Sequence, residues 1–136
     1  MRRTSIERYV EGLPLIVAMP DGGRGFYVDA LKRPHYAWDT YITRELAGFV
    51  DSTFQTIPER RGRVIAGLSM GGYGALSIAL KHPDMFCAAA SHSGAVGYAS
   101  RPLDREAWWR AEMGPVFGIN PKGGPNDIAK LATGLD

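Results

Sequence analysis

The pattern of apolar residues along the chain predicts three short β-strands. Residues Leu13–Met19 and Phe86–Ala90 are almost continuously apolar, and Arg63–Ala66 leads through Val64 and Ile65 into a glycine-rich stretch. A short run without polar alternation is typical of a strand that is buried on both faces, as in a parallel sheet. We therefore expect these runs to pair as parallel strands.

Helical segments separate the three runs. The stretch Trp38–Phe54 places apolar side chains at helical spacing, Gly12 ends the first helix, and His82-Pro83-Asp84 stops the third. The expected helices are Thr4–Glu11, Trp38–Phe54, Gly72–Leu80, Asp104–Met113 and Asn126–Ala132, the last capped by Asn126 and ended by Gly134. Helices that alternate with parallel strands predict an α/β fold with a doubly wound parallel sheet.

The composition is that of an ordinary folded protein. The chain has 136 residues, 45% hydrophobic and 22% charged, with a net charge of +2. This balance excludes disorder and gives no reason to expect a nucleic acid or an anionic membrane as partner. The single cysteine, Cys87, excludes an intrachain disulfide and a cysteine-rich metal site, and its apolar run predicts a buried, unreactive thiol.

The sequence shows no apolar membrane span and no signal peptide, which predicts a cytoplasmic protein. No apolar stretch is long enough to span a bilayer. Behind Arg2 and Arg3, the N-terminus lacks the apolar core of a signal peptide.

The sequence Gly67-Leu68-Ser69-Met70-Gly71 lies between a predicted strand and a predicted helix. G-x-S-x-G in this context is typical of a nucleophile elbow, a tight turn that exposes a serine hydroxyl. We expect Gly67 and Gly71 to remove side chains that would collide with the neighbouring strand and helix. Ser69 is then the nucleophile, and the Met70 N–H can donate to an oxyanion, helped by the helix dipole. The alternative is a glycine-rich turn without chemistry.

A serine nucleophile needs a general base, usually a histidine that a carboxylate orients. In the order Ser, acid, His, the chain offers His92 with Asp84 before it. These two residues stand at opposite ends of one predicted strand, about 20 Å apart, and cannot pair. We therefore expect His92 to line the site rather than to act as the base, His82 to end a helix, and His35 to be solvated. Three alternatives remain open: a fragment of a hydrolase, a natural short protein that has lost catalysis, and a coincidental elbow.

Four segments, in order along the chain, resemble one family. Gly-Leu-Ser-Met-Gly-Gly-Tyr-Gly-Ala-Leu at 67–76 is similar to its nucleophile motif, and 17–29 to its strand with a following Phe-Tyr-x-Asp loop. Residues 38–46 are similar to a helix that usually carries Glu where this chain has Asp39, and 126–128 to a segment after the nucleophile. The chain thus resembles the esterase family of α/β-hydrolases that includes S-formylglutathione hydrolase (esterase D), tributyrin-type and feruloyl esterases, and the mycolyltransferases.

The resemblance implies a three-layer αβα fold with a mostly parallel sheet, incomplete at both ends, so that residues 1–136 form a partial esterase domain. It implies hydrolysis of small-molecule esters or thioesters through acyl-Ser69, without metal or organic cofactor. The family's second oxyanion N–H and its triad Asp and His belong to strands that this chain lacks. The alternative is an inactive fragment or pseudo-esterase that acts as a binding or assembly module. Unpaired sheet edges at Leu13–Met19 and Phe86–Ala90 predict self-association.

Further candidates for the site come from loops and from one helix. The N–H of Gly22 or Gly23 is a candidate second oxyanion donor. Tyr27 and Asp29 are expected to pack and cap the loop beside the site, with Tyr27 a candidate for substrate contact. Trp108 and Trp109 fall in a segment that covers the pocket in this family. Because adjacent helical residues point in different directions, we expect one of them to face the pocket, with Trp108 the candidate, and the other the core. We expect a solvated or salt-bridged helix face at Asp39, Arg44 and Glu45. Asp127 is expected to lie near a helix N-terminus, where its charge is favoured by the helix dipole.

Overall fold

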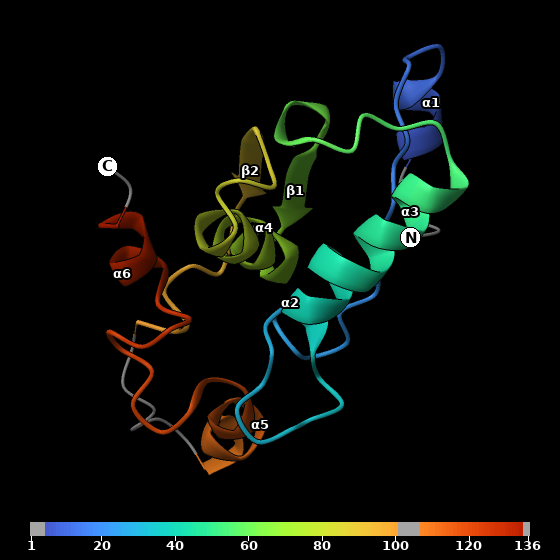
Figure 1. The fold of residues 1–136 in the computed structure, drawn as a ribbon. Coiled ribbons are helices and arrows are strands. Elements are labelled where there is room, and N and C mark those ends of the chain that lie inside the picture. Colours follow the sequence, from blue (N-terminus) through green and yellow to red (C-terminus); the bar gives the residue numbers. More distant parts are fainter. Residues whose placement is uncertain (1–4, 101–106, 135–136) are drawn as a thin grey trace.

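The computed structural model describes residues 5–100 and 107–134. Helix α4 (Met70–Lys81) lies beside a parallel two-stranded sheet of β1 (Val64–Leu68) and β2 (Ala88–His92) (Figure 1). The remaining elements are α1 (Ile6–Val10), α2 (Trp38–Thr40), the π-helical η1 (Tyr41–Leu46), α3 (Ala47–Thr53), the 3-10 turn η2 (Arg60–Gly62), α5 (Ala107–Phe117) and α6 (Ile128–Ala132). The predicted strand, helix and strand at the centre of the chain are confirmed, with β2 beginning and ending two residues later than expected.

The sheet is covered on one face. Val64 lies opposite Ala88 and Leu68 opposite His92 in the parallel register. Along β1, half-buried Ile65 and Gly67 alternate with exposed neighbours, so only one set of side chains faces covering structure. That cover is α4, which contacts both strands. Among the described residues, no second helical layer covers the face that carries Val64 and Leu68.

The prediction of a strand at Leu13–Met19 is wrong. The segment is extended but joins no sheet within the described ranges, and its backbone hydrogen bonds are local, such as that from the Leu13 N–H to the Val10 carbonyl at 3.0 Å. Its side chains are exposed, with Leu13 at 53% and Ile16 at 49%. An apolar run indicates only that its side chains favour burial. A β-strand also needs a neighbouring strand at hydrogen-bonding distance.

The apolar core lies against α4. Phe26, Val28, Tyr73, Ala99, Met113, Val116 and Phe117 form one buried cluster. The Tyr73 ring meets the rings of Phe26 and Phe117 edge-on, each at 5.6 Å between centroids. Burial raises the pKa of the Tyr73 phenol, which stays protonated and donates to the Asn126 carbonyl at 2.5 Å. Tyr73 therefore ties α4 to the loop before α6.

The long helix predicted from Trp38 is confirmed, and it contains a π-helical middle. The Ala47 N–H reaches the Ile42 carbonyl as well as that of Arg44, which is the wider hydrogen bond of a π-helix. The predicted apolar face is only partly buried, because Phe49 and Phe54 are exposed. None of the helices in the described ranges combines the length and hydropathy that a membrane span requires.

Cys87 is exposed, so the prediction of a buried thiol is wrong. It lies just before β2, and its Sγ is 3.2 Å from the Arg63 carbonyl at the start of β1. The error follows from the sheet: with only two strands described, the beginning of β2 has no cover on its outer side.

The cap of α6 is Asp127, not Asn126 as predicted. The Asp127 carboxylate accepts hydrogen bonds from the Ala129 N–H at 3.1 Å, the Gly123 N–H at 2.7 Å and the Ser100 hydroxyl at 2.5 Å. Burial alone would raise the pKa of this carboxyl, but the hydrogen bonds outweigh burial and lower it. The charged carboxylate thus holds three separate stretches of chain together.

Replacing Asp127 with Ala is expected to lower the free energy of unfolding at pH 7 by about 1–2 kcal/mol, because it removes the cap and leaves its donors without an acceptor. Since the folded pKa lies below the unfolded value of about 3.9, the contribution is complete above that pH. It is lost as the pH falls through the folded pKa. Urea unfolding followed by circular dichroism should show a difference between wild type and Asp127→Ala that shrinks on acidification. The Asp127→Asn variant, which keeps a capping oxygen, should lose less, and a pH-independent difference would contradict this role.

Candidate active site

Ser69 joins β1 to α4 in a conformation that is rare for a residue with a side chain. Its φ of 54° and ψ of −112° are costly for anything but glycine. Three backbone hydrogen bonds hold it there: its N–H donates to the His92 carbonyl at 2.9 Å, and its carbonyl accepts from the Tyr73 N–H at 3.0 Å and the Ala95 N–H at 3.1 Å. The residue itself is exposed. The turn therefore presents the Ser69 hydroxyl at the carboxyl end of β1.

Two glycines allow this turn to form. A Cβ on Gly67 would lie 2.2 Å from the Gly71 carbonyl carbon and oxygen, so the prediction for Gly67 is confirmed. A Cβ on Gly71 would meet only the Tyr27 ring, at 3.9 Å, so the prediction of a collision there is wrong. Gly72 is the second essential position, because its Cβ would lie 2.7 Å from the Ser91 Oγ and 2.9 Å from the Gly94 Cα. The helix can approach β1 and β2 this closely only without those side chains.

The N–H of Met70, the predicted oxyanion donor, lies at the start of α4. Met70 is the first residue of α4, so its N–H has no acceptor within the helix itself. The helix has 12 residues, and the positive end of its dipole lies at this N–H, directly after Ser69. The Met70 side chain packs against the apolar core, which fixes the backbone that carries the donor.

The loop candidates for a second donor are already engaged. The Gly23 N–H donates to the Asp21 carboxylate at 2.8 Å. Burial raises the pKa of Tyr27, as does the Asp21 charge, while a hydrogen bond from the Gly22 N–H to the phenol lowers it slightly. The Tyr27 hydroxyl also donates to the Pro20 carbonyl at 3.3 Å. Asp29, expected to cap the loop beside the site, instead caps the start of the long helix by accepting from the Thr40 N–H and hydroxyl.

His92 touches the elbow through its backbone. It is paired with Leu68 and its carbonyl accepts from Ser69, but its side chain is exposed. Within residues 5–100 and 107–134, neither an imidazole nor a carboxylate is hydrogen-bonded to the Ser69 hydroxyl. Of the two tryptophans, Trp109 packs on the core and against Tyr98 at 4.6 Å between centroids, whereas Trp108 is 59% exposed.

A carboxylate–histidine pair does exist, but at the far end of α4. Buried Asp39 accepts from His82 Nε2 at 2.6 Å and from Lys81 Nζ at 3.3 Å, and Lys81 also donates to the Asn126 amide oxygen at 2.7 Å. His82 follows the last residue of α4, so it lies about 20 Å from Ser69 at 1.5 Å per residue. This distance excludes His82 as the base for Ser69. The prediction of a salt-bridged helix residue at Asp39 is confirmed by these contacts, although Asp39 is buried.

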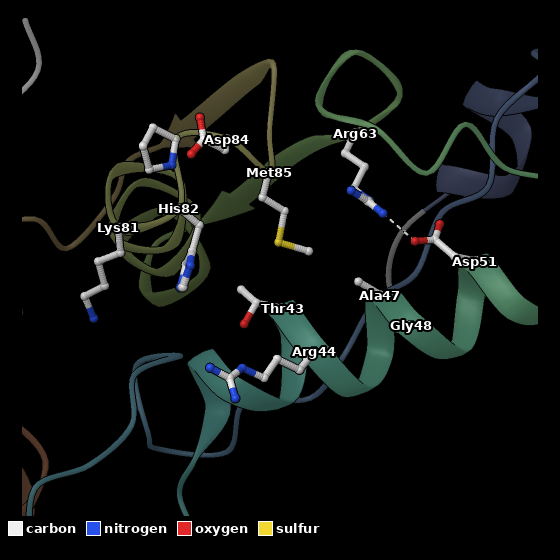
Figure 2. Close-up of a pocket in the computed structure, with 11 residues that line it drawn as sticks. Thr43, Arg44, Ala47, Gly48, Asp51, Arg63, Lys81, His82, Asp84 and Met85 are labelled. Carbon is white, nitrogen blue, oxygen red and sulfur yellow. Dashed lines mark hydrogen bonds and ion pairs between the residues drawn. The ribbon is translucent and has the colours of Figure 1, made fainter.

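Figure 2 shows the pocket beside this cluster. His82 and Lys81 project from the end of α4, above Thr43 and Arg44 on the long helix, and Arg63 forms an ion pair with Asp51 at the pocket's other end. Sequence reasoning missed the cluster, because Asp39 and His82 are 43 positions apart and neither lies in a local motif. The ion pairs join α4 and β1 to the long helix.

Comparison with known proteins assigns the chain to a family. The sequence profile of the Putative esterase family matches residues 4–126. The chain belongs to this esterase family. It is 42% identical over 87 residues to Esterase Rv1288 of Mycobacterium tuberculosis, an alignment that covers 61% of this chain and 19% of that protein.

Two solved structures resemble this esterase-family chain over almost its whole length. The fluorophosphonate-binding serine hydrolase FphF of Staphylococcus aureus is 29% identical with a TM-score of 0.80, covering 97% of this chain and 51% of that one. The S-formylglutathione hydrolase FrmB of the same species is 30% identical with a TM-score of 0.73, covering 96% and 50%. These similarities confirm the α/β-hydrolase fold. The chain spans 19% of the mycobacterial esterase and about half of each staphylococcal hydrolase.

Replacing Gly72 with Ala is expected to lower the free energy of unfolding by about 1–3 kcal/mol, because the new methyl group overlaps Ser91 and Gly94. Gly48 in α3 is the matched control: its Cβ would meet nothing within 4 Å, so Gly48→Ala should stabilise by about 0.5–1 kcal/mol. Urea unfolding followed by tryptophan fluorescence measures both. A Gly72→Ala variant as stable as wild type would contradict the close approach of α4 to β2.

Replacing Asp39 with Asn is expected to cost about 2–4 kcal/mol of stability, because Lys81 is left partly buried without its anion. Glu45→Gln on the same helix changes an exposed carboxylate and should alter stability by less than about 0.5 kcal/mol. Thermal unfolding by calorimetry compares the two variants. Equal effects would show that the buried ion pair does not stabilise the fold.

Proposed function

We propose that this chain carries the nucleophile of a serine esterase that cleaves small-molecule carboxylic esters or thioesters through an acyl-Ser69 intermediate. The single observation that carries the proposal is the strained turn at Ser69, which holds an exposed hydroxyl next to the unpaired N–H at the start of α4. Membership of the esterase family and similarity to proteins named as a serine hydrolase and an S-formylglutathione hydrolase support it.

In the proposed reaction, the Ser69 Oγ attacks the substrate carbonyl carbon while a general base takes the hydroxyl proton. The carbonyl oxygen becomes an oxyanion that accepts a hydrogen bond from the Met70 N–H, a contribution of about 3 kcal/mol in comparable sites. Collapse of the tetrahedral intermediate expels the alcohol or thiol, which takes up a proton. Water then hydrolyses the acyl-serine by the reverse sequence, returning the proton to Ser69.

The base and its carboxylate are proposed to lie outside the described residues. Asp39–His82 is too far from Ser69, and His92 contacts Ser69 through its carbonyl alone among the hydrogen bonds of the described chain. Tyr27, His92 and Trp108 remain candidates for substrate contact, of which Tyr27 lines the same groove as Ser69, and Gly22 remains a candidate for the second oxyanion donor.

The second candidate function is a catalytically inactive binding or assembly module. It is favoured by the absence, within the described ranges, of a histidine hydrogen-bonded to the Ser69 hydroxyl. The two functions differ in one measurable property, the nucleophilicity of Ser69.

Incubation of the protein with a fluorescent fluorophosphonate, with the base supplied by polypeptide outside the described residues, is expected to label wild type and to leave Ser69→Ala unlabelled, because the probe phosphonylates an activated serine. Ser52→Ala is the matched control, since Ser52 only bonds the Phe49 carbonyl of its own helix, and it should label like wild type. In-gel fluorescence and intact mass measure the adduct. An unlabelled wild type would favour the inactive module, and labelling that survives in Ser69→Ala would exclude Ser69 as the nucleophile.

A further inference from the structure

Strained backbone gathers around the elbow. In the described ranges, positive φ at residues other than glycine occurs at Phe26, Tyr27, Ser69 and Ser93. Ser93 directly follows β2, and its neighbours His92 and Ala95 are hydrogen-bonded to the Ser69 backbone. Such strain persists only where surrounding contacts enforce it, and it is most common at functional sites. The strained pair Phe26–Tyr27 lies far from Ser69 in sequence, so its part in the site must come from the contacts that it makes.

The Tyr27 ring fills the space between a loop and helix α4. On one edge of the ring, a Cβ on Gly74 would lie 2.7 Å from Cδ2 and one on Gly71 would lie 3.9 Å from Cε2. On the opposite edge, a Cβ on Gly22 would lie 2.4 Å from Cε1. Side chains at positions 22 and 74 would therefore displace the ring. Glycine at these positions lets one aromatic ring contact the backbone of both the loop and the first two turns of α4.

The Tyr27 hydroxyl ties the same loop to the ring. It accepts a hydrogen bond from the Gly22 N–H and donates to the Pro20 carbonyl at 3.3 Å. Burial and the Asp21 charge raise the pKa of the phenol, so it stays protonated at neutral pH and keeps this donated bond. A phenol has a single O–H, and here that proton is used within the loop. The hydroxyl therefore acts on the loop and does not donate to a substrate.

The tethered ring lies beside the reacting groups of the elbow. Tyr27 lines the same groove as Ser69 and Met70, and it contacts α4 from position 71 onward. The neighbouring Phe26 packs edge-on against Tyr73 in the aromatic core, which anchors the strained pair from the other side. Loop, ring and helix thus form one rigid unit at the start of α4. Contacts that fix the geometry of reacting groups raise the rate of the chemical step.

We propose that Tyr27 is a positioning residue for the acylation of Ser69. Its ring and hydroxyl together hold the loop 20–23 against the first two turns of α4, which keeps the Ser69 hydroxyl and the Met70 N–H in one arrangement. The inference rests on the proposed function, because it assigns Tyr27 a part in the reaction of Ser69. Ring and hydroxyl make separate contacts, so the hydroxyl can be removed while the packing of the ring is kept.

The Tyr27→Phe variant keeps the ring and removes the tether. The reaction is labelling by a fluorophosphonate, with the base supplied by polypeptide outside the described residues. The Ser69 Oγ bonds to phosphorus, fluoride leaves and the base takes the hydroxyl proton. The variant is expected to lower the labelling rate at saturating probe at least about tenfold, because a loosened loop misplaces the reacting groups. The probe concentration that gives half of this rate should change less than about twofold, since the loss falls on the chemical step.

Tyr41→Phe is the matched control. The Tyr41 hydroxyl makes no hydrogen bond within the part of the chain that the structure describes, and Tyr41 does not line the groove that contains Ser69. This variant should be labelled like wild type at every probe concentration.

Hydrogen exchange tests the tether without catalysis. In Tyr27→Phe, the Gly22 amide should exchange at least about tenfold faster than in wild type, because it loses its acceptor. The Tyr73 amide, which donates to the Ser69 carbonyl, should keep its wild-type rate and so report that α4 is still folded.

Labelling of Tyr27→Phe at the wild-type rate, or a change in the half-maximal probe concentration alone, would overturn the proposal. So would an unchanged Gly22 amide, or faster exchange at both amides, which would assign Tyr27 a role in folding only. A wild type that the probe does not label would overturn the proposed function and this inference together. That failure is distinguishable from one in which wild type and Tyr27→Phe are labelled equally fast, which overturns the inference alone.

Discussion

The close contact between the start of α4 and the end of β1 is the constraint on which the candidate site depends. Gly67 and Gly72 have no side chains because the helix, β1 and the end of β2 occupy that space. With the helix this close to the sheet, the chain must reverse direction within one residue, and Ser69 takes the positive φ that the reversal requires. The position of the hydroxyl is thus a consequence of backbone packing.

Helix α4 transmits this constraint to the rest of the described chain. Its one side packs on the two strands, and through Tyr73 its other side joins the aromatic cluster and the loop before α6. At its C-terminal end, Lys81 and His82 meet Asp39 on the long helix. A helix held on two sides and at one end keeps its first N–H at a fixed place, which is what preorganised stabilisation of an oxyanion requires.

Local patterns predicted the elements and the turn, while contacts between distant segments escaped them. The strand–serine–helix sequence predicted the tight turn at Ser69 and the need for glycine at position 67, because both follow from the geometry of the turn itself. The choice of Gly72 over Gly71 depends on Ser91 and Gly94, which reach the elbow from β2 and the turn that follows it. The apolar run at Leu13–Met19 predicted a buried strand, but the segment is exposed and unpaired, because pairing depends on a neighbour that the described residues do not contain. Asn126 and Asp127 are both good caps, and only the positions of Gly123 and Ser100 decide between them.

The three backbone hydrogen bonds at Ser69 have a consequence for how such proteins evolve. None of them involves the side-chain hydroxyl, so the turn would keep its shape with another small residue at this position. A descendant that had lost its chemistry would therefore preserve the same backbone, maintained by selection for folding alone. The backbone of the elbow and the reactivity of its hydroxyl are therefore separable properties of this fold.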